Sequence, residues 1–82
     1  MNDIGIQKEM LAILSGLDGI VIRESVLAGE TEIRVGRPLT RDEFDREMKE
    51  LMGTGRVRRT WDPFGEAQYE ITGAGKKALM GR

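Results

Sequence analysis

The residues of this sequence that could do chemistry are cations arranged in two groups. Three arginines fall within positions 56–59, and three further basic residues are spaced along positions 41–49. Guanidinium and ammonium groups bind phosphate oxygens, and the counterions that they displace from a polyanion supply most of the affinity of non-specific nucleic-acid binding. The candidate contacts with duplex DNA are Arg41, Arg46, Lys49, Arg56, Arg58 and Arg59.

The sequence lacks the side chains that most enzymes and metal sites use. It contains no cysteine and no histidine, and its serines, Ser15 and Ser25, have no imidazole base to activate them. The segment 73–76 looks like a phosphate-binding loop, but Glu70 stands in place of the first glycine and Lys77 in place of the hydroxyl residue. We therefore expect no enzyme activity, no metal, no cofactor and no small-molecule ligand.

Length and charge limit the size of the fold and the kind of partner. The 82 residues indicate one domain, 1–82. The net charge is −1, but residues 1–33 carry −4 and residues 34–82 carry +3, so a polyanion would meet the second half. No apolar run approaches the roughly 20 residues that span a bilayer, and no signal peptide is readable. We expect a cytoplasmic protein that does not bind membranes.

The first helix is expected on apolar spacing. Asn2 or Asp3 can cap a helix that runs to about Leu14 and ends at Ser15-Gly16, where glycine tolerates a left-handed conformation. Its predicted buried stripe is Ile6, Met10, Ile13, Leu14 and Leu17.

Residues 20–36 allow two interpretations. A helix over 23–35 would turn Val26, Leu27, Ile33 and Val35 inward, although a glycine in its middle costs about 1 kcal/mol relative to alanine. An extended segment is the alternative, because Thr31, Ile33 and Val35 alternate with charged residues.

A third helix is predicted over 41–52 by its capping signals. The Thr40 hydroxyl can accept from the Glu43 backbone N–H while the Glu43 carboxylate accepts from the Thr40 N–H, which is a capping box. Gly53 and Gly55 end the helix. Its predicted buried stripe is Phe44, Met48, Leu51 and Met52.

A hairpin and a last helix follow. Strands are predicted over 56–61 and 66–71, joined by a type I turn over 62–65, with Asp, Pro and Gly at the positions that this turn favours. Thr72 can cap a final helix. Each element is expected to have one face formed by a set of side chains. These sets are Val57, Arg59 and Trp61 in the first strand, Ala67, Tyr69 and Ile71 in the second strand, and Ala74, Ala78, Leu79 and Met80 on the inward side of the final helix.

From Leu39 to Leu79 the chain resembles the small bacterial and phage winged-helix domains, including the PadR-like and MarR-like regulators. The matching motifs are P-L-T-R-D-E-F, M-K-E-L-M-G-T-G-R-V, D-P-F-G and Y-E-I-T-G-A-G-K-K-A-L. The resemblance implies an α+β winged helix: a three-helix core, a two-stranded β-hairpin wing and a C-terminal helix. This order requires a helix within 20–36, which favours the helical interpretation. In DNA-binding members, helix 41–52 would enter the major groove and wing 56–71 would touch the backbone or the minor groove.

The expected function is a small DNA-binding transcriptional regulator acting as a homodimer, but the charge of helix 41–52 opposes it. The non-core positions of this helix hold three basic and five acidic residues: Arg41, Asp42, Glu43, Asp45, Arg46, Glu47, Lys49 and Glu50. Acidic residues in a first turn also stabilise the helix dipole. The alternative function is a protein–protein interaction module that uses this acidic face and Phe64.

Several residues allow both a structural and a functional interpretation. Phe64 either folds back over Trp61 and the hairpin or stays exposed as an anchor for a protein partner. Trp61 is expected to pack rather than to stack on bases. The methionines at 10, 48, 52 and 80 are expected to fill the core. Lys76, Lys77 and Arg82 are expected to form a solvated cationic face of the last helix.

Overall fold

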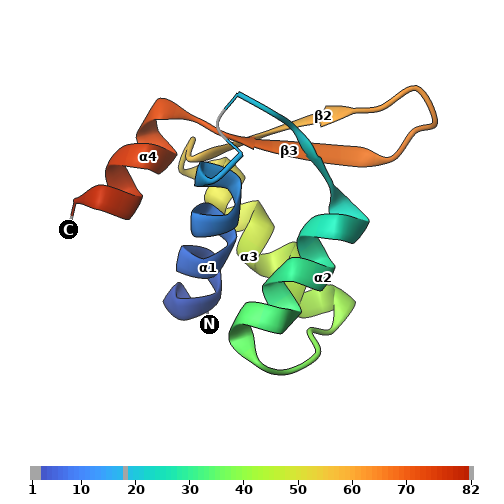
Figure 1. Cartoon of the computed structure of the whole chain (residues 1–82), viewed down its shortest axis with the longest axis horizontal. Coiled ribbons are helices and arrows are strands. Elements are labelled where there is room, and N and C mark those ends of the chain that lie inside the picture. Colours follow the sequence, from blue (N-terminus) through green and yellow to red (C-terminus); the bar gives the residue numbers. More distant parts are fainter. Residues whose placement is uncertain (1–2, 18, 82) are drawn as a thin grey trace.

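The computed structural model describes residues 3–17 and 19–81, and within them it contains four helices and a three-stranded antiparallel sheet (Figure 1). Asn2 and Arg82, considered above, lie outside the described residues. The elements are α1 (Ile4–Ser15), β1 (Ile22–Arg23), α2 (Glu24–Val35), α3 (Arg41–Gly53), β2 (Val57–Trp61), β3 (Ala67–Ile71) and α4 (Gly73–Met80). This order is that of a winged helix, so the predicted fold class is confirmed.

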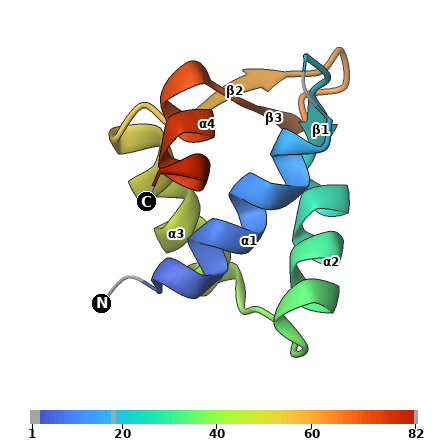
Figure 2. The same cartoon turned by 60° about the vertical axis from the view of Figure 1, so that its left-hand side comes forward.

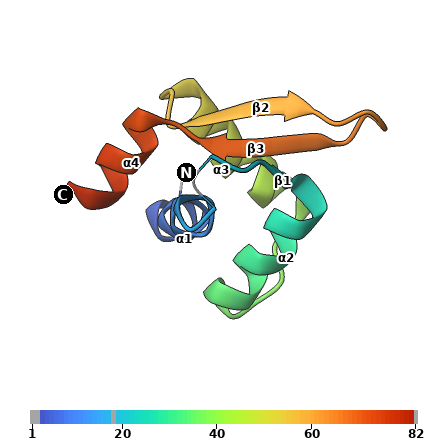
Figure 3. The ribbon, with the colours of Figure 1, turned by 45° about the horizontal axis from the view of Figure 1, so that its top comes forward.

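The sheet has the order β1-β3-β2, and β3 is its middle strand. Tyr69 pairs with Ile22 on one side and with Arg59 on the other. Strands β2 and β3 continue past the helices as a projecting hairpin, the wing (Figure 3). Both wing strands were predicted to within one residue, whereas the two-residue strand β1 was not predicted. Two residues are too short for an alternating pattern to show in sequence.

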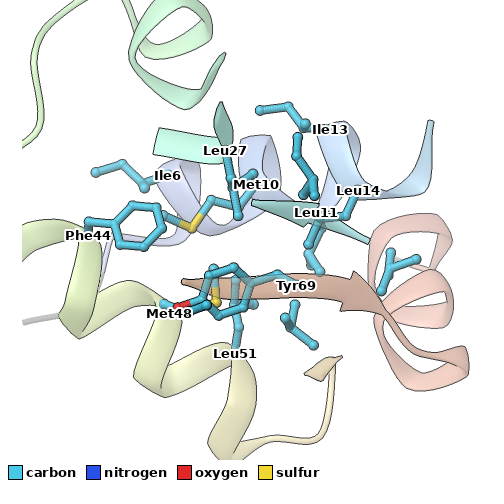
Figure 4. Packing of buried hydrophobic residues seen from close by; sticks show 14 residues of the cluster. Ile6, Met10, Leu11, Ile13, Leu14, Leu27, Phe44, Met48, Leu51 and Tyr69 are labelled. Carbon is cyan, nitrogen blue, oxygen red and sulfur yellow. The ribbon is translucent and has the colours of Figure 1, made fainter. Parts of the chain in front are cut away.

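The helices α1, α2 and α3 enclose the core, and β3 closes it (Figure 4). Helix α1 contacts α2, α3, α4 and β3, and it runs through the middle of the assembly in Figure 2. The rings of Phe44 and Tyr69 meet edge to face, with centroids 6.3 Å apart. The buried apolar side chains are Ile6, Met10, Leu11, Ile13, Leu14, Ile22, Leu27, Phe44, Met48, Leu51, Val57, Ala67, Tyr69 and Ile71.

The caps explain where the helices begin. Asp3 accepts from the N–H of Ile6, and Thr72 accepts from the N–H of Gly75. The capping box of Thr40 and Glu43 is present as predicted, with both hydrogen bonds 3.0 Å long. Helix α1 ends at Ser15-Gly16 as predicted, although Gly16 has a φ of −68° and does not use the left-handed conformation that glycine tolerates.

The inward faces of α2 and α4 differ from expectation. In α2, Leu27 and Thr31 are buried, and the Thr31 hydroxyl donates to the Leu27 carbonyl. Val26 and Ile33, predicted to face inward, are 50% and 75% exposed because α2 meets α1 along its 27–31 face instead. In α4, only Ala78 and Leu79 pack against the core, and two predicted core residues are exposed: Ala74 and Met80.

Glu47 is the largest departure from the expected surface of α3. It was counted among the non-core positions, but it has no exposed surface. Its carboxylate accepts from Gln7 Nε2 at 2.7 Å, from the Asp3 N–H at 3.0 Å and from Arg46 Nε at 3.2 Å. A buried carboxylate is stable only when it is bonded in this way. Glu47 therefore fastens the start of α1 to α3.

Gly75 marks a close approach between α4 and the start of the hairpin. A Cβ atom at this position would clash with the Arg56 carbonyl oxygen and would lie 2.7 Å from Ile71 Cγ1. A Cβ atom at Gly29, in α2, would meet no atom within 4 Å. The two glycines therefore have opposite roles: Gly75 is required for packing, and Gly29 is not.

We expect Gly75→Ala to lower the free energy of unfolding by about 2–3 kcal/mol, because backbone must move to relieve the overlap. The matched variant Gly29→Ala should raise it by about 1 kcal/mol through helix propensity. Urea denaturation followed by circular dichroism measures both. Equal effects of the same sign would contradict the packing of α4 described here.

Candidate nucleic-acid interface

Helix α3 and the core-facing side of the hairpin border one continuous concave surface. One hollow, of about 370 Å³, lies between Arg41, Lys49 and Met52 of α3 and Arg59 and Tyr69 of the sheet. A second hollow, of about 430 Å³, continues from it between the start of α2 and the wing. Arg41 and Arg59 line both hollows. The surface bounded by Arg41, Lys49, Arg59 and Trp61 is called the α3–wing surface below.

Arg41 lies at the start of α3 with its charge already paired. Its guanidinium bonds to Glu24 of α2, and its Nε lies 3.2 Å from Asp45 one turn along α3. The hydrogen bond to Glu24, followed by the Coulomb attraction of that carboxylate, raises the pKa of Arg41. A phosphate at this position would have to share or displace two carboxylates.

Lys49 and Arg59 are the α3–wing cations that have no carboxylate partner among residues 3–17 and 19–81. Both side chains are exposed. The Arg59 guanidinium lies 5.0 Å from the centre of the Trp61 ring, in a cation–π contact. These two cations, one on each wall of the hollow, are available to an anion without breaking an ion pair.

The other three predicted contacts lie elsewhere. Arg58 is on the opposite face of β2 from Arg59, and it bonds at 2.7 Å to Glu70, its cross-strand neighbour. Arg46 is held by the buried Glu47. Arg56 lines a groove between α1 and α4 together with Lys8 and Lys77, away from the wing. The six cations grouped by sequence therefore do not form one cluster.

The aromatic residues of the wing are exposed. Trp61 is 60% exposed and Phe64 is 87% exposed. The expectation that Trp61 packs is wrong, and of the two interpretations of Phe64 the exposed one is confirmed, because the hairpin carries both residues beyond the helices. Met10 and Met48 fill the core as expected, Met52 is half-buried and Met80 is exposed, so the expectation for Met80 is wrong.

Asp62 organises the wing tip. Its Oδ1 accepts from the backbone N–H groups of Phe64 at 2.9 Å and Glu66 at 2.8 Å, and its carbonyl accepts from the Gly65 N–H at 3.0 Å. Gly65 has a φ of +85°, which favours glycine. The predicted turn at 62–65 is therefore present, and the aspartate stabilises it from within.

Two contacts tie the wing tip to the corner between β1 and α2. Asp62 Oδ2 lies 3.3 Å from Arg23 Nε, as an ion pair whose geometry falls short of a hydrogen bond. Glu66 accepts from the Ser25 N–H at 3.1 Å and from its hydroxyl at 2.8 Å. No local pattern predicts these contacts, because they join residues about 40 positions apart.

Tyr69 lies under the α3–wing surface and connects the sheet to both neighbouring helices. Its hydroxyl donates to Glu24 Oε1 at 3.0 Å, and Glu24 is the partner of Arg41. Burial, and then the hydrogen bond to Glu24, raises the pKa of Tyr69 to about 12. In the first turn of α3, the Arg37 guanidinium and the Thr40 N–H lower the pKa of Glu43 to about 2.

Neither a metal centre nor a membrane segment can be located in the described part of the chain. Among residues 3–17 and 19–81, no three acidic side chains are grouped in a way that could hold a metal ion. The helices in this range are also too short and too polar to cross a bilayer.

Comparison with known proteins finds solved structures that have the same fold as this chain. No protein-family model matches the sequence, and no curated protein matches it. Among solved structures, RosR of H. salinarum superposes with a TM-score of 0.77 at 20% identity, covering 90% of this chain and 64% of that one. A MarR-family transcriptional regulator from Silicibacter pomeroyi gives a TM-score of 0.74 at 23% identity, with 90% and 45% coverage. The chain thus has the fold of these regulators and spans less than two thirds of their length.

The elevated pKa of Tyr69 gives a direct test of the site, because the protein has a single tyrosine. In the folded protein we expect its phenol to deprotonate near pH 12, against about 10 in an unfolded chain. Between these values the unfolded chain releases a proton that the folded state retains, so stability falls as pH rises from about 10 to 12. Ultraviolet absorbance of tyrosinate, with and without denaturant, measures both values. A folded-state midpoint near 10 would contradict the buried hydrogen bond to Glu24.

Proposed function

We propose that this protein is a winged-helix DNA-binding regulator that contacts duplex DNA through the α3–wing surface. The observation that carries the proposal is that Lys49 and Arg59, neither with a carboxylate partner, stand on opposite walls of one concave surface. The fold that this chain shares with RosR and a MarR-family transcriptional regulator supports the same assignment.

The proposed phosphate contacts differ in whether an existing ion pair must be broken to make them. Lys49 and Arg59 can meet phosphates directly. Arg41 and Arg58 must first exchange Glu24 and Glu70 for phosphate oxygens. Arg46 and Arg56, also predicted as contacts, have weaker support because one is held by Glu47 and the other faces the α1–α4 groove.

The outer face of α3 limits affinity. Asp42, Asp45 and Glu50 are exposed on the same helix as Lys49 and would repel phosphates. We therefore expect weak and strongly salt-dependent binding by one copy, because few phosphate contacts supply the affinity. Useful specificity would require two copies on symmetric half-sites, so the proposal includes a homodimer on DNA. Catalysis forms no part of the proposed role.

One observation favours a second function. Phe64 is 87% exposed, and the outer face of α3 is acidic, so the domain could instead bind a protein partner through these features. This function predicts no interaction with duplex DNA at low salt.

An amide-shift titration of labelled protein with a mixed-sequence duplex at about 50 mM salt separates the two functions. We expect shifts on α3 and on residues 56–66 that fade as salt is raised. An absence of shifts at millimolar duplex would reject DNA binding and leave the protein partner.

Single substitutions then test the surface. We expect Lys49→Ala and Arg59→Ala each to weaken duplex binding and to reduce the salt slope by about 1, since each removes one phosphate contact. Arg58→Ala should have a smaller effect, because its charge is shared with Glu70. Lys77→Ala, on the α1–α4 groove, is the matched control and should bind as wild type. Fluorescence anisotropy over a salt series measures all four; equal losses in every variant would place the interface elsewhere.

A further inference from the structure

The wing tip carries an apolar side chain that the proposed phosphate contacts do not use. Phe64 is 87% exposed at the end of the hairpin and lies outside the buried cluster. We propose that Phe64 is a wedge that inserts between neighbouring base pairs in the minor groove of duplex DNA. The inference rests on the proposed function and specifies how the wing would engage the same partner.

The turn holds the ring away from the protein. Asp62 accepts from the backbone N–H groups of Phe64 and Glu66, and Gly65 takes the left-handed conformation that closes the turn. The backbone of Phe64 is therefore held in the turn between β2 and β3. A side chain on a pinned turn cannot reach the core, and its exposure is a property of the turn rather than of a loose loop.

The charges near the tip are arranged so that a polyanion can approach it. The outermost residues are Pro63, Phe64 and Gly65, which carry no charge. The two flanking carboxylates point back into the protein: Asp62 is buried against Arg23, and Glu66 is bonded to Ser25. A phosphate beside the tip would not meet a free carboxylate, and it would find the guanidinium of Arg59 behind Trp61.

The tip is continuous with the α3–wing surface, which favours DNA over a protein partner. Gly65 lines the same hollow as Arg41, Arg59 and Trp61. Each wing strand has five residues, a length of about 16 Å. Adjacent major and minor grooves are about 17 Å apart, half of the roughly 34 Å helical repeat. A helix in the major groove would therefore leave the tip near the next minor groove, where proteins insert phenylalanine as a wedge.

A wedge predicts that the protein prefers duplexes with easily unstacked base steps, a preference that hydrogen bonds to base edges would not produce. Pyrimidine–purine steps such as TA unstack more easily than other steps, so a wedge favours duplexes that contain them. Binding should therefore be tighter to a duplex with a central TA step than to a G·C-only duplex of equal length, and the difference should depend on Phe64.

The test uses a short duplex with 2-aminopurine as the adenine of one central TA step, together with the G·C-only duplex. Wild type should raise 2-aminopurine fluorescence on binding, because the base is unstacked. Phe64→Ala should abolish that rise and weaken TA-duplex binding roughly fivefold to tenfold, with little change on the G·C duplex. Phe64→Leu, which keeps an apolar wedge, should retain part of both effects.

Controls separate the wedge from the proposed function and from folding. Lys49→Ala should weaken binding to both duplexes alike and still give the fluorescence rise at saturation. The melting temperature of Phe64→Ala should equal that of wild type, because the ring buries almost no surface. If wild type binds the duplexes but Phe64→Ala matches it in affinity and fluorescence, the wedge is wrong and the ring belongs to a protein contact. If wild type binds neither duplex at about 50 mM salt, the proposed function itself fails.

Discussion

The burial of one phenol in the middle strand of the sheet determines how the parts of this protein sit together. Tyr69 is paired with both neighbouring strands, packs edge to face on Phe44 of α3 and donates to Glu24 of α2. Glu24 in turn holds Arg41 at the start of α3. The sheet, the second helix and the third helix are therefore positioned by a single connected set of contacts, and the α3–wing surface lies directly above it.

Local signals in the sequence predicted most of the elements, because the interactions that define them are local. The capping box at 40–43 and the turn at 62–65 each join residues no more than four positions apart, and both are present. The failures are features set by tertiary contacts. The burial of Glu47 depends on Gln7, 40 positions away, and the exposure of Val26 and Ile33 depends on which face of α2 meets α1.

In the candidate site, too, local features could be predicted from the sequence and features set by tertiary contacts could not. The sequence identified the cations but could not show that Glu24 pairs with Arg41, because the two residues lie 17 positions apart on different helices. Alternation along the predicted strand did place Arg59 and Arg58 on opposite faces, as the structure has them. The sequence left both a folded-back and an exposed Phe64 open, and the geometry of the turn decides between them.

The attachment of the wing to the corner between β1 and α2 affects how any partner is met. Arg23 and Ser25 hold the hairpin through Asp62 and Glu66, so the conformational entropy of ordering the wing is lost when the chain folds. A mobile wing would lose that entropy on association and would bind more weakly for the same contacts. Here the surface is preorganised, and any adjustment of shape at the interface falls to the partner.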